Sequence, residues 1–214
     1  MRLSSVDDLR SNYRQPSQRA VDKVIDRLDE HCVDFIAKSP FLLLSTANAD
    51  GACHGSPKGG PPGFAQVLDE HRLAWADFSG NNRLDSFQDL VTNANVAVLF
   101  LIPGLDETLR VNGTAALVTD PELCQQLAIG GKAARVVVVL TVGEVYVHCA
   151  KALRRAGLWS PGSWLDPKDL PSAACMLKDH AALDADPVAI QVSLEQGLQS
   201  TLWEPGGADP PSPA

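Results

Sequence analysis

The sequence lacks the short motifs that mark the common nucleotide, hydrolase and metal sites. No P-loop, GxGxxG, GxSxG, HExxH or EF-hand loop occurs in its 214 residues. Its five cysteines include no CxxC pair, and its five histidines show no ligand spacing. A disulfide framework, a structural zinc site and a metal-dependent enzyme are therefore disfavoured, and a reducing cytoplasm is the expected compartment.

The chain also lacks an excess of positive charge and a long apolar run. It has 18 Lys and Arg against 26 Asp and Glu, a formal net charge of −8. Nucleic acids and anionic membranes require a dense cationic face, so neither is expected as a partner. The charged start MRLSSVDDLRSNYRQ does not fit a secretory signal. With 45% hydrophobic residues the chain can form one core.

The hydrophobic pattern predicts a helix followed by antiparallel strands. Residues 17–37 carry apolar side chains at steps of three and four, which is typical of an amphipathic helix. The apolar run 41–47 and the turn at Asp50 and Gly51 predict a first hairpin. Further strands are expected at 63–69, 72–77, 94–101, 107–118 and 134–149. At least six strands therefore precede residue 150.

Helices interrupt this sheet and do not alternate with its strands. They are expected at 82–92, 121–128, 171–183 and 187–200. This order favours a mainly β fold with flanking helices, a closed or split antiparallel barrel, over a doubly wound sheet. The expected parts are a helical extension at 1–40, the barrel at 41–150, a helical extension at 151–204 that packs on the barrel or on a dimer partner, and a disordered tail at 205–214.

One loop has the composition of a phosphate cradle. Ser79, Asn81 and Asn82 offer hydroxyl and amide donors, and Arg83 offers a guanidinium, directly before a predicted helix. The alternative is that Ser79 or Asn81 only caps the helix and that Arg83 is solvated.

A second group of cations and aromatics lies later in the chain. Strand alternation places Thr108 and Arg110 on one face of the segment ETLRVNG. An exposed face of the sheet would explain them equally well. The KALRR stretch could likewise be an ordinary cationic helix surface, and Trp159 a core aromatic.

Several stretches together carry a family resemblance. They are FLLLSTANADGACHGSPKGG, GFAQVLDEHRLAWADFSGNNRLDSFQDLVTNANVAVLFLIPG, ETLRVNGTAALV and YVHCAKALRRAGLW. Over about residues 30–150 the chain resembles the FMN-binding split-barrel family that includes pyridoxamine 5'-phosphate oxidases, and in particular the subgroup described as related to them. The resemblance implies a six-stranded antiparallel FMN-binding split β-barrel. It also implies a homodimer with the flavin site at the subunit interface.

The resemblance further implies a set of cofactor contacts. They are Lys58, Gln66, Ser79, Asn81, Asn82, Arg83, Thr108, Arg110, Lys151, Arg154 and Trp159. Arg83 falls on the family's phosphate-binding position, and Lys58 and Gln66 fall in strands along the flavin and its ribityl chain. Thr108 takes the place of a glutamine near the flavin ring, and Arg110 that of the following arginine. The last three residues of the set are expected from the second subunit.

The predicted function is that of an FMN-dependent oxidoreductase acting on an unknown small molecule. Pyridoxamine 5'-phosphate oxidases end in a basic, histidine-containing segment, whereas this chain ends LWEPGGADPPSPA. An authentic oxidase of that substrate is therefore not expected, and the sequence offers no catalytic acid or base. One alternative is a flavin, deazaflavin or haem binding or storage protein on the same barrel, with His148 as the haem candidate. Another is a structural protein that has lost its cofactor.

Overall fold

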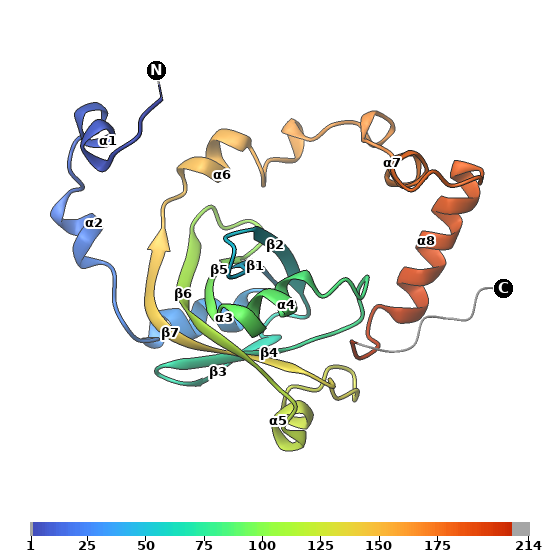
Figure 1. Ribbon diagram of the computed structural model, residues 1–214, viewed down its shortest axis with the longest axis horizontal. Coiled ribbons are helices and arrows are strands. Elements are labelled where there is room, and N and C mark those ends of the chain that lie inside the picture. The colour runs from blue at the N-terminus through green and yellow to red at the C-terminus, as the bar shows by residue number, and fades with distance from the viewer. Residues whose placement is uncertain (1, 207–214) are drawn as a thin grey trace.

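The computed structural model describes residues 2–206 and shows a strongly curved antiparallel sheet flanked by helices (Figure 1). The strands are β1 (Phe41–Ala47), β2 (Cys53–Gly59), β3 (Ala65–Asp69), β4 (Arg72–Ala76), β5 (Asn95–Leu101), β6 (Thr108–Val118) and β7 (Val137–His148). They are hydrogen-bonded in the order β2-β1-β5-β6-β7-β4-β3. The mainly β, antiparallel architecture is confirmed.

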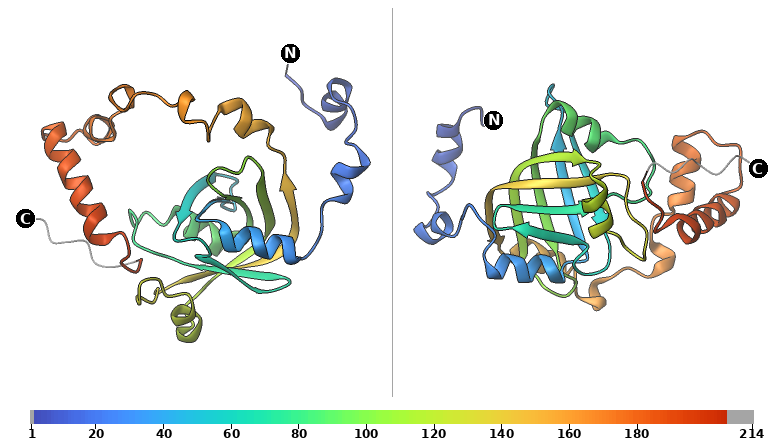
Figure 2. Two further views of the ribbon diagram at one scale, coloured as in Figure 1. Left: turned by 180° about the vertical axis from the view of Figure 1, so that it is seen from behind. Right: turned by 90° about the horizontal axis from the view of Figure 1, so that it is seen from below.

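The six strands that the family resemblance implied are wrong in number, because the sheet has seven. The hairpin expected at 63–69 and 72–77 is present as β3 and β4, and it extends the sheet beyond β7. Within residues 2–206 no backbone pairing joins the two edge strands, β2 and β3, and the hydrogen-bonded ladder is open there. The sheet nevertheless curls around one interior, as the views from behind and below show (Figure 2).

Helices flank this sheet or extend away from it (Figures 1 and 2). They are α1 (Val6–Asn12), α2 (Gln18–Asp22), α3 (Glu30–Lys38), α4 (Asp85–Thr92), α5 (Pro121–Gln126), α6 (Lys151–Ala156), α7 (Ala173–His180) and α8 (Pro187–Thr201), with short 3₁₀ turns η1 (Pro161–Ser163) and η2 (Pro167–Asp169). Asp29 caps α3 by accepting a hydrogen bond from the Cys32 amide at 2.9 Å. Cys32 and Ile36 of that helix enter the interior, so α3 closes one side of it.

Strand alternation fills the interior with apolar side chains. In β1, Leu42, Leu44 and Thr46 are buried, whereas the residues between them are half-buried or exposed. Trp75 and Phe100 are the largest fully buried side chains. Each such side chain contributes on the order of 1.5–3 kcal/mol, so this interior fixes the strands that carry the polar residues described below.

The single helix expected at 17–37 is wrong. The chain forms α2 and α3 with an extended segment between them, where Ile25 pairs with Val145 through hydrogen bonds of 3.0 and 2.7 Å. The cause lies in the sheet, because β4 pairs with β7 only as far as Thr141. Beyond that residue the backbone groups of β7 need partners, and Ile25 supplies them.

A β-bulge between Asn112 and Gly113 bends the long β6–β7 ribbon. A side chain at Gly113 would clash with the backbone carbonyl of Thr141. At this bend the two strands approach so closely that only glycine fits.

The C-terminal part of the chain leaves the barrel and returns to it. Figures 1 and 2 show α6, α7 and α8 following one another in an arc away from the sheet. The end of the arc docks beside β4: the Ser79 amide donates to the Glu204 carbonyl at 2.8 Å, and Trp203 meets the Phe78 ring edge-on. Pro205 and Gly206, the start of the predicted tail, lie against Phe78 and Asp77, and 207–214 fall outside the described residues. Within residues 2–206, no helix combines the length and apolarity that crossing a bilayer requires.

Candidate functional site

Two adjoining hollows of about 360 and 590 Å³ open along β2, next to the end of β4. We call them together the Lys58 cleft. Both are lined by Ser56, Pro57, Lys58, Asp77, Phe78, Gly80 and Asn81. The first hollow extends to the start of α4, and the second to Leu202 and Trp203 at the end of the C-terminal arc. Segments far apart in the sequence thus form one site.

Lys58 and Asp77 form the charged centre of this cleft. The ammonium of Lys58 lies 3.4 Å from a carboxylate oxygen of Asp77, and the two side chains are 22% and 13% exposed. The ammonium also lies 5.3 Å from the centre of the Phe87 ring. Burial raises the pKa of Asp77, and the charge of Lys58 opposes that rise. The pair is therefore a partly desolvated ion pair.

The loop from Ser79 to Leu84 leads into an uncapped helix. Asn82 and Leu84 adopt left-handed backbone conformations, with φ of 53° and 59°. Helix α4 starts at Asp85, and no side chain caps its first turn. Asp85, Ser86 and Phe87 of that turn line the smaller hollow. The free N–H groups of the turn and the positive end of the helix dipole therefore lie beside the cleft.

The predicted phosphate residues Ser79, Asn81 and Asn82 line the cleft, but Arg83 does not. Its guanidinium donates to both oxygens of Asp85, at 2.9 and 3.4 Å, and the side chain is 69% exposed. Lys58 is the cationic side chain that the structure places inside the cleft.

Gln66 lies apart from these residues. It lines a separate hollow of about 270 Å³ beside Leu127 and Ala128, on the side of the sheet near α5. Its amide oxygen accepts a hydrogen bond from Gln126 at 3.5 Å. The structure of the single chain therefore does not bring Gln66 together with Lys58.

Thr108 and Arg110 face His148 and Tyr146 across the β6–β7 pair. The Arg110 guanidinium donates to the Tyr146 hydroxyl at 3.1 Å, and Lys23 lies 5.1 Å from the centre of the same ring. Burial and the charges of Arg110 and Lys23 lower the pKa of His148. This polar face is not part of the Lys58 cleft.

The three residues expected from a second subunit lie in and just after α6. Lys151 is exposed, and Arg154 donates to Asp106 at 2.8 Å. The Trp159 indole donates to the Leu105 carbonyl at 2.9 Å. These contacts fix the segment against the loop between β5 and β6 of its own chain, away from the Lys58 cleft.

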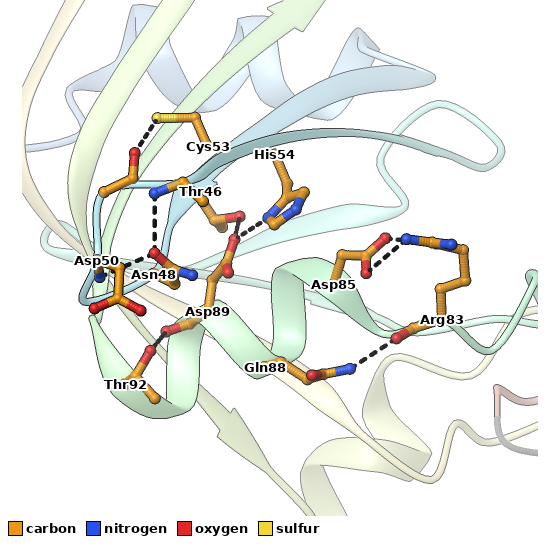
Figure 3. A network of polar contacts seen from close by, with 12 residues as sticks. Thr46, Asn48, Asp50, Cys53, His54, Arg83, Asp85, Gln88, Asp89 and Thr92 are labelled. Atoms are coloured by element: carbon orange, nitrogen blue, oxygen red, sulfur yellow. Dashed lines mark hydrogen bonds and ion pairs between the residues drawn. The ribbon is translucent and has the colours of Figure 1, made fainter.

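A network that the sequence analysis missed borders the cleft (Figure 3). Asp89 of α4 is almost fully buried, and one of its oxygens accepts hydrogen bonds from Thr46 at 2.6 Å and from Nδ1 of His54 at 2.8 Å. The hydrogen bond from Thr46, followed by that from His54, lowers the pKa of Asp89. Thr46 and His54 are paired across β1 and β2. The register of this hairpin is the sequence signal that could have placed Thr46 beside His54, and it follows only if the turn between β1 and β2 is predicted correctly.

Comparison with known proteins identifies the family. The sequence profile of pyridoxamine 5'-phosphate oxidase matches residues 28–149, more than half of the 214-residue chain. The chain belongs to the pyridoxamine 5'-phosphate oxidase family. The matched segment contains all of β1 to β7 and ends just before α6. No curated protein matches the chain.

Solved structures resemble the barrel at low sequence identity. HupZ of Group A Streptococcus is 16% identical with a TM-score of 0.46, over 56% of this chain and 92% of that chain. General stress protein 26 of Bacillus anthracis is 18% identical with a TM-score of 0.41, over 54% and 89%. An FAD-binding protein of Mycobacterium smegmatis is 15% identical with a TM-score of 0.41, over 58% and 97%. At these scores the likeness carries nothing about ligand or activity.

Proposed function

We propose that this member of the pyridoxamine 5'-phosphate oxidase family binds FMN and uses it in an oxidoreductase reaction on a small molecule. The observation that carries the proposal is the donor set of the Lys58 cleft. It combines an ammonium, the small residue Gly80, the amides of Asn81 and Asn82, and the uncapped first turn of α4. A phosphate monoester requires such charged and backbone donors at short range.

The two acidic residues in the cleft do not prevent a phosphate from binding there. Asp77 is paired with Lys58, and Asp85 is paired with Arg83, so neither carboxylate presents an uncompensated charge. Gly80 has open space around its Cα, which allows a ligand to approach the backbone. The residues present therefore suit the phosphate end of FMN.

We further propose that the ring end of the flavin is completed by a second copy of the chain. The predicted ring contacts Thr108 and Arg110, and the α6 residues Lys151, Arg154 and Trp159, do not line the Lys58 cleft of their own chain. Two groups that are separated within one protomer can meet across a symmetric interface. The exposed apolar side chains of the C-terminal arc, among them Trp164, Leu165 and Leu170, favour such an interface.

In this site the protein supplies binding and electrostatics. Lys58 and the first turn of α4 would hold the phosphate, and the loop around Asn81 and Asn82 would donate to its oxygens. Arg110 of the second copy would place a positive charge near the ring, where it would favour the reduced, anionic form. When bound, FMN supplies hydride transfer.

The absorbance spectrum of the purified protein tests the proposal. We expect flavin bands, release of FMN on heating as identified by mass, and a light-scattering mass of twice the chain. A colourless protein that takes up no FMN on titration would contradict the cofactor assignment. A flavin-loaded monomer would contradict the shared site.

A further inference from the structure

We infer that Lys23, Arg110 and Tyr146 form a further anion-binding site, which takes an oxyanion group, a carboxylate or a phosphate, of a small molecule. The site lies on the outer face of the β6–β7 ribbon and shares no residue with the Lys58 cleft. Three segments build it: β6, β7 and the extended stretch after α2 that runs beside β7 (Figure 1). The site goes beyond the proposed function, because it does not require a bound flavin.

Strand alternation gathers polar side chains on this face of the ribbon. Arg110 is paired with Tyr146 in the β6–β7 register, and Thr108 is paired with His148 two residues along. The β6 residues that alternate with Thr108 and Arg110 are buried in the core. Lys23 and all of the paired residues except Thr108 are half-buried, so this face is open to solvent.

Two cations share one aromatic ring at this position. The Lys23 ammonium lies 5.1 Å from the centre of the Tyr146 ring, and the guanidinium carbon of Arg110 lies 5.7 Å from it. Their hydrogen-bond acceptors are neutral: Lys23 donates to the Val147 carbonyl at 2.7 Å, and Arg110 donates to the Tyr146 hydroxyl at 3.1 Å. Among residues 2–206 neither cation forms an ion pair with a carboxylate. A bound anion would relieve the repulsion between these two like charges.

The acidic side chain in the neighbouring pair of the ribbon does not supply that counter-charge. Glu144 lies on the same face, and it accepts a hydrogen bond from the Asn112 side chain opposite at 2.6 Å. The cation of the cleft differs in this respect, since Lys58 is paired with Asp77. The outer face of the ribbon therefore carries a positive charge that the surrounding carboxylates leave uncompensated, although the chain as a whole is acidic.

His148 reports the charge of this site. Burial, followed by the charges of Arg110 and Lys23, lowers the pKa of His148, and no carboxylate of residues 2–206 is among the causes. Its Nδ1 is buried and has no hydrogen-bond partner within the same residues. Buried polar atoms in a purely structural cluster are nearly always paired. The orphaned nitrogen beside two unpaired cations therefore favours a ligand site.

The donors that remain suit an oxyanion. An ammonium has three N–H donors and a guanidinium five, and the hydrogen bonds formed within residues 2–206 use one of each. The planar guanidinium of Arg110 matches the two oxygens of a carboxylate or a phosphate, and the Tyr146 hydroxyl can donate to a third atom. In the proposed dimer Arg110 lies near the flavin ring of a second copy, so the ligand would be an anionic substrate. This last step alone rests on the proposed function.

Histidine-ring NMR of the full chain, without added flavin, tests the site. The His148 signals are assigned by their loss in His148→Gln and followed through a pH titration in sodium sulfate and in sodium chloride of equal ionic strength. Sulfate should raise the pKa of His148, because it neutralises the two cations that lower it. Signals of His31, whose side chain is 85% exposed, should not respond to the exchange of salt. Sodium formate in a third titration distinguishes a site for carboxylates from one for phosphates. A pKa of His148 that is the same in all three salts would overturn the inference.

Charge-removing variants show which cations bind the anion. Arg110→Gln and Lys23→Gln should each weaken the Kd of sulfate by about tenfold or more, and either suffices if the other does not fold. The control Lys38→Gln removes an exposed cation that is paired with Asp34, and it should leave the Kd unchanged. The response should also persist in Lys58→Met.

The outcomes separate this site from the proposed flavin site. An unchanged Kd of sulfate in both ribbon variants, or a response that disappears in Lys58→Met, would overturn the inference and leave the flavin proposal to its own titration. A chain that responds to sulfate and binds no flavin would refute the proposed function and retain the anion site.

Discussion

Replacing Lys58 by methionine should weaken binding of FMN much more than binding of riboflavin. The substitution keeps most of the aliphatic stem and removes the ammonium that lies inside the cleft, 3.4 Å from Asp77. Loss of one charge-assisted hydrogen bond costs on the order of 1.5–3 kcal/mol, which corresponds to about 10- to 100-fold in Kd. Riboflavin has no phosphate, so its Kd should change by less than about threefold. Fluorescence titration of apoprotein with both flavins measures the two constants.

A comparison with Arg83→Ala decides which cation binds the phosphate. Arg83 is held on Asp85 and is largely exposed, so its removal should cost FMN affinity less than removal of Lys58. A selective loss of FMN in Arg83→Ala, with none in Lys58→Met, would refute the assignment drawn from the cleft. Equal losses of FMN and riboflavin in Lys58→Met would show that Lys58 does not contact the phosphate.

The unpaired Asp77 in Lys58→Met needs its own control. Burial raises the pKa of Asp77, and the variant removes the charge that opposes this rise. A carboxyl with a raised folded pKa favours folding when protonated and loses that contribution as the pH increases through it. The melting temperature of the variant should therefore lie furthest below that of the wild type at neutral pH, and the difference should shrink as the pH falls towards 4. The double variant Lys58→Met, Asp77→Asn should remove this pH dependence and retain the selective loss of FMN.

Three further expectations concern the barrel itself. Gly113→Ala should lower the free energy of unfolding, measured in urea, by about 1–3 kcal/mol, because the added Cβ clashes with backbone at the bulge. Gly143→Ala is the control and should cost much less, because a Cβ there would lie 3.6 Å from its nearest neighbour, the Asn112 carbonyl oxygen. The lowered pKa of Asp89 contributes stability that is lost as the pH falls through that pKa. Thr46→Val removes the main cause of the lowered pKa, so on acidification the melting temperature of the variant should begin to fall at a higher pH than that of the wild type. An unchanged acid transition would contradict this. Burial raises the pKa of Cys32 to about 12, so iodoacetamide at pH 8 should alkylate the three exposed cysteines and spare Cys32 in the folded chain, as peptide masses will show.

Local pattern was sufficient to predict most of the barrel. The Asp50 and Gly51 turn and the alternation in 41–47 correctly predicted the first hairpin, since both signals act within a few residues. The single helix predicted across 17–37 is interrupted because Ile25, in its middle, pairs with Val145 of β7, which is distant in the sequence. No periodicity within the segment contains that information.

The site was predictable in composition and less so in geometry. The loop at 79–82 was found because small and amide-bearing residues precede a helix, which is a local signal. The direction of the Arg83 side chain depends on its ion pair with Asp85, and many rotamers are compatible with the same sequence. His54 and Asp89 are 35 residues apart and meet only through the packing of α4 on β1 and β2. Such a pair requires tertiary structure.

The return of the chain end to Phe78 makes the C-terminal arc a closed loop that starts at β7 and ends at the wall of the Lys58 cleft. Closing a loop costs entropy that grows only slowly with its length, so the arc can tolerate insertions as long as its last contacts persist. Trp203 belongs both to those contacts and to the cleft, so docking of the arc and binding of a ligand in the cleft are energetically coupled. Thermodynamic linkage then requires that docking of the arc change ligand affinity by the same factor by which the ligand changes the docking equilibrium. Remote substitutions in this segment are therefore expected to behave as binding mutations without touching the ligand.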